Sequence, residues 1–126
     1  MSNKLFLNKV TRRLFSSSFV LPDKKQFVVF LKDYKDPECL QRRLGVREKH
    51  LSGAITANKN GSLQAGGAIL DSHQSGKMKG SVMIMSAEST EEVEQMILQD
   101  PYTKAKVWES WEIYPFKSAI GLPHLG

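Results

Sequence analysis

The chain has 126 residues, enough for one domain with a single core, and no apolar run approaches the roughly 20 residues of a membrane-spanning helix. Of its 18 basic and 13 acidic residues, six and one fall within residues 1–26, so residues 27–126 contain twelve of each. The net charge of +5 therefore belongs to the N-terminal segment, and we expect a soluble protein whose folded part is electrically neutral.

Residues 1–22 are predicted to form a leader that precedes the fold. As far as Val20 they contain several spaced bases, no acidic residue and the run Ser16-Ser17-Ser18, which is typical of mitochondrial transit peptides. Arg13-Leu14-Phe15-Ser16 is similar to a matrix-processing site, with the mature chain beginning near Ser16. The lone Cys39 suits a reducing compartment. We expect a mitochondrial matrix protein; the alternative is a disordered basic tail on a cytoplasmic protein.

The first half of the expected domain, residues 23–117, reads as strand, helix, strand. Residues 27–31 are apolar and rich in β-formers, so they predict a strand covered on both faces. Asp36 and Pro37 predict an N-cap and first helical position for a helix to about Ala57, and residues 58–61 supply its C-cap. Residues 63–70 predict a second strand, in which the glycines favour a bulge or a close backbone approach.

The second half repeats the pattern with the order strand, helix, strand. After a polar loop at 71–77, residues 81–85 predict a third strand that is apolar on both faces. Ser89 to Glu92 form a capping box for a second helix with Val93, Met96 and Ile97 on its buried side. Asp100-Pro101 predicts one further turn through Ala105, and residues 108–116 predict the last strand before a tail.

This β-α-β-β-α-β order predicts an α+β, ferredoxin-like fold, with a four-stranded antiparallel sheet and two helices on one face. The first and third strands are central in this topology, yet both are apolar on the face that the helices leave open. An apolar sheet face of that size is larger than a monomer normally exposes. We therefore expect a two-fold homodimer that packs sheet to sheet.

The first predicted helix combines an apolar stripe with two polar side chains. At about 100° per residue, one stripe contains Leu40, Leu44, Leu51 and Ile55. Arg47 falls close to its middle and His50 at its edge, about one turn away. This pattern predicts that the leucines pack, with Arg47 and His50 at a site or simply at a solvated edge.

RNA-recognition modules share this topology, but the sequence argues against one. Their sheets carry aromatic rings on which bases stack, whereas the third predicted strand presents Ser81, Met83 and Met85. The neutral domain also lacks the positive charge that phosphate contacts require. We expect no nucleic-acid partner and no membrane association.

The motifs taken together resemble the YciI-like (YCII-related) family of dimeric α+β-barrel proteins. The resemblance covers about residues 27–117 and is carried by residues 43–51, 61–67, 80–81, 89–92, 100–107 and 115–117. It implies a His–Asp pair at His50 and Asp100, in a pocket between the helix, the sheet and a dimer partner. It also links the chain to proton-transfer eliminations or isomerisations on ring compounds. We therefore expect a cofactor-independent lyase or isomerase that acts on a small ring or keto-acid substrate.

The chemistry of these residue types fits that role. A carboxylate at Asp100 would orient the imidazole of His50 as a general base. Arg47 would hold an anionic oxygen of the substrate, and Gly66 would allow close approach of the substrate. Two structural alternatives stay open: Asp100 as an N-cap only, and Arg47 paired with Glu48 or with carboxylates near Glu92. Cys39 is expected to pack.

Other residues are not expected to carry chemistry. His73 and His124 have no partner in view, and the three histidines lack the spacing of metal ligands. We therefore expect no metal and no cofactor, with Tyr102, Trp108 and Trp111 as packing. A non-catalytic module that binds a small metabolite in the same pocket is the main alternative function, and a structural adaptor is a weaker one.

Overall fold

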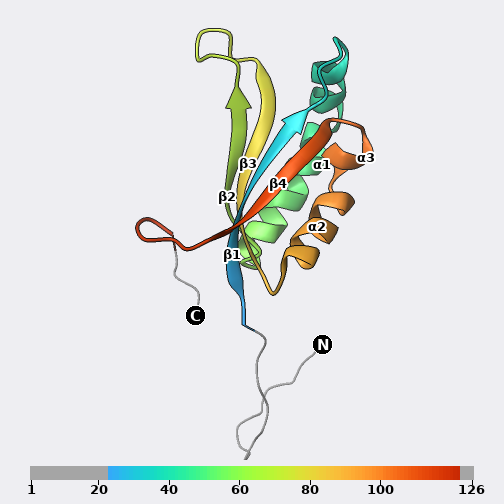
Figure 1. Cartoon of the computed structure of the whole chain (residues 1–126). Coiled ribbons are helices and arrows are strands. Elements are labelled where there is room, and N and C mark those ends of the chain that lie inside the picture. The colour runs from blue at the N-terminus through green and yellow to red at the C-terminus, as the bar shows by residue number, and fades with distance from the viewer. Residues whose placement is uncertain (1–22, 123–126) are drawn as a thin grey trace, which may run out of the picture.

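The computed structural model describes residues 23–122, which form one four-stranded sheet with helices against it (Figure 1). The predicted leader, with its processing site at Ser16, lies outside these residues and stays a prediction, as does the matrix location. No helix among residues 23–122 combines the length and apolarity needed to cross a bilayer. In chain order the elements are β1 (Lys25–Asp33), α1 (Cys39–Lys59), β2 (Leu63–Leu70), β3 (Met78–Ala87), α2 (Thr90–Gln99), α3 (Pro101–Lys104) and β4 (Trp108–Phe116).

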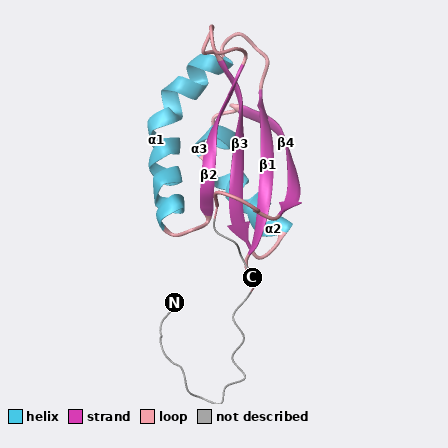
Figure 2. Cartoon of the chain, turned by 90° about the vertical axis from the view of Figure 1, so that its left-hand side faces the viewer, coloured by secondary structure: helices cyan, strands magenta, loops and turns pink. Residues whose placement is uncertain are grey.

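The sheet confirms the predicted α+β arrangement. Its strand order is β2-β3-β1-β4, every neighbouring pair is antiparallel, and α1 and α2 lie on one face (Figure 1). Figure 2 looks onto the other face, where the strands lie in front of α2 and α3, and α1 is seen beside β2. The register is interrupted between Leu63 and Ala65, next to the glycines that predicted an irregularity. The fold thus has one covered face and, within residues 23–122, one face without a helix.

The predicted bounds are right for β2 and β4, whereas β1 and β3 extend beyond the apolar residues that predicted them. Ser89 caps α2 as expected, because its hydroxyl accepts a hydrogen bond from the Glu92 N–H at 3.1 Å. The core lies between the sheet and the helices. It consists of Phe27, Val29, Leu31, Cys39, Leu63, Met83, Met85, Ala87, Val93, Ile97, Tyr102, Val107 and Trp108.

The predicted start of the first helix is wrong. α1 begins at Cys39 with Glu38 as N-cap, two residues after the predicted cap at Asp36. The Asp36 carboxylate lies ahead of the helix, where it forms two hydrogen bonds with the Arg42 guanidinium, at 2.7 and 2.8 Å, and interacts with the backbone of Glu38. At the other end Gly61 has φ 91°, the left-handed conformation that suits a glycine after a helix.

The predicted packing face of α1 is also wrong. Leu44, Leu51 and Ile55 are 49%, 37% and 57% exposed, so the apolar stripe does not pack into the core. The face that turns toward the sheet is displaced by about one position. It consists of small and polar side chains at helical spacing: Cys39, Arg43, Val46, His50, Ala54 and Ala57.

Candidate functional site

His50 and Asp100 are 50 residues apart in the chain and hydrogen-bonded to each other. Nδ1 of His50, on α1, lies 2.8 Å from Oδ1 and 3.1 Å from Oδ2 of Asp100, at the junction of α2 and α3. Oδ1 of Asp100 also accepts the N–H of Tyr102 at 2.8 Å. Asp100 therefore caps α3 and orients the imidazole at the same time. Because Nδ1 donates to the carboxylate, the neutral ring keeps a free lone pair on Nε2.

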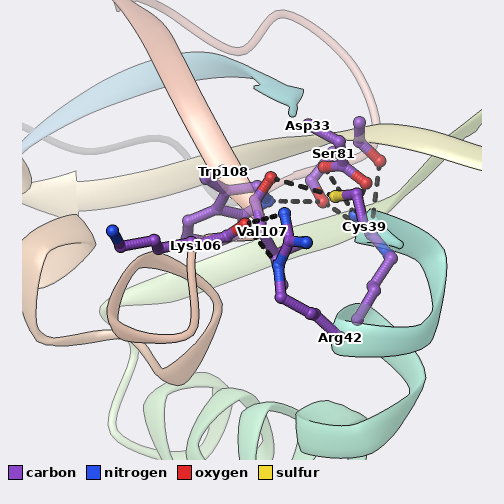
Figure 3. Close-up of polar contacts among 9 residues, drawn as sticks. Asp33, Cys39, Arg42, Ser81, Lys106, Val107 and Trp108 are labelled. Carbon is purple, nitrogen blue, oxygen red and sulfur yellow. Dashed lines mark hydrogen bonds and ion pairs between the residues drawn. The ribbon is translucent and has the colours of Figure 1, made fainter. Parts of the chain in front are cut away.

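Two buried aromatic rings fix the plane of the His50 imidazole. The Tyr102 ring stacks on it with centroids 3.8 Å apart and an interplanar angle of 14°. Trp108 meets it edge-on at 5.6 Å, and its Nε1 donates to the Ser81 hydroxyl at 3.2 Å (Figure 3). Tyr102 and Trp108 are each 2% exposed, so the imidazole rests against a rigid wall.

Arg43 is a buried residue that the sequence analysis did not single out. Its Nη1 lies 2.8 Å from both carboxylate oxygens of Asp33, and its Nη2 donates to the Ser81 hydroxyl at 2.8 Å and the Gly80 carbonyl at 3.2 Å. Burial raises the pKa of the Asp33 carboxyl, and the charge of Arg43 opposes this shift. Arg43 thus ties α1 to β1 and β3. The available signal was its position seven residues before His50, on the same face of the helix.

The guanidinium of Arg43 also contacts the aromatic wall. Its carbon Cζ lies 4.6 Å from the centroid of the Tyr102 ring, within the range of a cation–π interaction. Among residues 23–122, Nε of Arg43 is the only buried side-chain nitrogen or oxygen that has no hydrogen-bond partner. A neighbouring π-face partly compensates such a donor. Tyr102 therefore connects the buried ion pair to His50.

The site residues line a cleft of about 910 Å³ between α1, α2 and the strands β2 and β3. Arg47, His50, Gly66 and Asp100 all contribute to its wall. A Cβ built on Gly66 would lie 3.5 Å from the Val82 carbonyl oxygen, which is ordinary contact, so the backbone itself tolerates a methyl group there. Leu51 and Ile55, which were expected to pack in the core, line the cleft as well.

Arg47 is exposed at this cleft, and within residues 23–122 it forms no hydrogen bond or ion pair. The alternative that it pairs with Glu48 or with carboxylates near Glu92 is therefore not realised. Burial raises the pKa of the Tyr102 phenol, while the charges of Arg43 and Arg47 oppose this shift. The lining of the cleft thus includes a free guanidinium, a phenol and an oriented imidazole.

The remaining candidates lie apart from this group. His73 is in the exposed loop between β2 and β3, and His124 is outside the described residues. Cys39 is buried with Sγ 3.6 Å from the Val107 carbonyl (Figure 3), and burial raises the pKa of its thiol. In the described part of the chain, no three His, Cys, Asp or Glu side chains are grouped as a metal ion would require.

Comparison with known proteins gives consistent matches. The family model described as "YCII-related domain" matches residues 26–117. Fusaric acid biosynthesis protein 2 of Gibberella fujikuroi is 33% identical over 100 residues, which are 75% of this chain and 94% of that protein. Protein YciI of Escherichia coli O6:H1 is 33% identical over 98 residues, which cover 75% of this chain and 98% of that protein.

A solved structure is similar in both fold and sequence. It is 5-chloro-2-hydroxyhydroquinone dehydrochlorinase from Burkholderia phenoliruptrix AC1100, in complex with 2,5-dihydroxybenzoquinone. The two chains superpose with a TM-score of 0.63 and 31% sequence identity, over 75% of this chain and 95% of that one. Both the fold and nearly the whole length of that protein are therefore shared.

Proposed function

This chain belongs to the YCII-related family, and on that premise we propose that it is a cofactor-independent lyase or isomerase with His50 as its general base. The observation that carries the proposal is the 2.8 Å hydrogen bond between His50 and Asp100 at the wall of an open cleft. The similar dehydrochlorinase is named for a chlorinated ring compound. For this chain we propose small ring or keto-acid substrates.

In the proposed reaction Nε2 of His50 removes a proton from the substrate. The electron pair of the broken bond moves onto a conjugated oxygen. In an elimination this pair then returns to the ring, and the leaving group departs with the electron pair of the bond that held it. Asp100 stabilises the imidazolium that forms, and the unpaired guanidinium of Arg47 holds the negative oxygen. The imidazolium returns its proton to the product or to water, so no outside oxidant or reductant is needed.

The test is turnover of 5-chloro-2-hydroxyhydroquinone and related halogenated or keto-acid ring compounds by the full chain. Replacement of His50 by Gln should lower kcat by roughly 10²–10⁴-fold because it removes proton transfer, and Asp100→Asn should also lower it. The matched control is His73→Gln, at an exposed histidine outside the cleft. Unchanged turnover in folded His50→Gln would refute the general-base role.

A non-catalytic module that binds a small acidic ring compound is the second candidate. The free guanidinium of Arg47 and the large cleft suit capture of an anion as well as they suit catalysis. Thermal-shift screening separates the two, because a ligand stabilises the protein by RT ln(1 + [L]/Kd) whether or not it is converted. Binding without any product would favour the module. The adaptor hypothesis needed a pocket filled by its own side chains, and the open cleft does not support it.

We also propose that two copies of the chain pack through the open sheet face. Phe30 and Tyr114 are 43% and 46% exposed and meet edge to face with centroids 6.3 Å apart. Strand register puts Val28 opposite both Ile84 and Tyr114, so apolar residues continue across the three strands. A second copy would cover this face with the same apolar surface.

A further inference from the structure

The cleft continues well beyond the His50–Asp100 pair. Its lining includes residues of α1 from Arg43 to Lys59, sixteen residues apart or about 24 Å at 1.5 Å per residue. His50 lies less than halfway along, so nine residues, or about 13 Å of helix, follow it. On α2 the lining likewise runs away from Asp100, through Met96 to Glu92. Both helices therefore border an extension of the cleft on the same side of the pair.

The character of the lining changes along this extension. Near the pair the wall holds Arg43, Ser81 and Tyr102, which are polar or charged. Further along, the lining includes a cluster of apolar residues rich in methionine, together with Asn58, Lys59, Glu92 and Gln95. We call this part the methionine arm, and it consists of Ala54, Ala57, Leu63, Met83, Met85 and Met96.

β3 supports this direction independently. Ser81 accepts a hydrogen bond from Arg43, which marks the polar end, and Met83 and Met85 follow on the same face of the strand, about 13 Å from Ser81 to Met85. Met85 pairs with Leu63, and the Leu63 carbonyl accepts the side-chain amide of Asn58 at 2.8 Å. The floor of the cleft thus becomes apolar in the direction of the α1 C-terminus.

We propose that the methionine arm binds an apolar substituent of the substrate, so that the substrate class is a ring with an acidic oxygen and an extended alkyl or isoprenoid-like chain. The proposal rests on the proposed function, because the ring is placed by His50 and Arg47. A bare ring in contact with His50 would leave most of the arm empty. Thioether side chains are flexible and polarisable, and they adapt to chains of different shape.

The experiment measures the Kd of the full chain by calorimetry for 2,5-dihydroxybenzoquinone and for its 3-methyl, 3-pentyl and 3-undecyl derivatives. Burial of each methylene should tighten Kd by about fourfold until the arm is filled. In Ala57→Leu the added side chain fills the arm, so the gain in affinity from the chain should be lost. The matched control is Thr56→Leu, the adjacent helix position, which is exposed and outside the cleft.

A second variant keeps the proposal testable if Ala57→Leu does not fold. Met96 is half-buried, and Met96→Gln introduces an amide of similar volume, so the gain per methylene should shrink. Equal affinity for all four compounds would overturn the methionine arm and leave the role of His50 standing. The proposal would also be overturned if longer substituents still tightened Kd in both variants, or if none of the compounds bound. A gain abolished by both variants, together with unimpaired turnover in His50→Gln, would support the arm and refute the base.

Discussion

Gly80 lies where β1 and β3 come too close for a side chain. A Cβ at this position would be 2.5 Å from the Leu31 carbonyl oxygen, and the Gly80 carbonyl itself accepts a hydrogen bond from Arg43. Gly80→Ala should therefore push the strands apart and lower the free energy of unfolding by about 1–3 kcal/mol. Urea denaturation measures the change.

The matched control for Gly80 is Gly45, in the middle of α1. A Cβ there meets nothing within 4 Å, and alanine is the better helix former by up to about 1 kcal/mol. Gly45→Ala should raise the free energy of unfolding. Equal effects of the two substitutions would contradict the steric argument.

Single residues also show where sequence reasoning stops. Asp100-Pro101 was predictable as a cap from local chemistry, and the resemblance suggested its partner His50, because both signals lie in short motifs. Arg43 was not predictable in this way. An arginine in a helix is normally solvated, and only its long-range pairing with Asp33 and Ser81 makes burial tolerable.

At the scale of elements, the strands were easier to predict than the face of the helix. β2 and β4 were bounded correctly, because turn residues and β-forming runs delimit them. The orientation of α1 was not, because apolarity alone placed Leu44 and Ile55 inside. The sheet instead receives the small and polar side of α1, which leaves room for the cleft beside Ala54 and Ala57.

An ion pair at the N-terminal end of α1 predicts that the free energy of unfolding depends on pH. Asp36 and Arg42 form a solvent-accessible ion pair at 2.7 Å, and Arg42 also donates to the Lys106 carbonyl (Figure 3). The hydrogen bond with Arg42 lowers the pKa of Asp36 from 3.8 to about 2. A carboxyl group whose pKa is lower in the folded state stabilises the fold at pH values above its unfolded-state pKa. This stabilisation is lost as the pH falls through the folded-state pKa.

The free energy of unfolding of the wild type and of Asp36→Asn should therefore differ by a constant amount above about pH 5. The difference should shrink to a small remainder as pH falls to 2, where Asp36 is protonated in the unfolded state and about half protonated in the folded state. Equilibrium urea titrations at several pH values measure it, with Asp71→Asn as an exposed control that has no ion pair within the described residues. A difference that persists unchanged at pH 2 would show that the carboxylate charge is not responsible.

At the scale of the whole molecule, the two faces of the sheet differ in what lies on them. The covered face holds the cleft between the helices and the sheet, whereas Phe30 and Tyr114 are exposed on the opposite face. The alternation along β1 separates them: Val29 and Leu31 are buried toward the helices, and Phe30 points the other way. A second copy on the open face, as proposed, would therefore leave the cleft on the opposite face uncovered.

The dimer proposal gives a test with a built-in comparison. In a two-fold interface each substitution occurs twice, so Phe30→Glu would bury two carboxylates in apolar surroundings, a strongly unfavourable change. Sedimentation should then show a folded monomer where the wild type sediments as a dimer. Leu44→Glu is the control, because Leu44 is similarly exposed, at 49% against 43%, but lies on α1. A wild type that sediments as a monomer, or dimerisation lost in Leu44→Glu and kept in Phe30→Glu, would place the interface elsewhere.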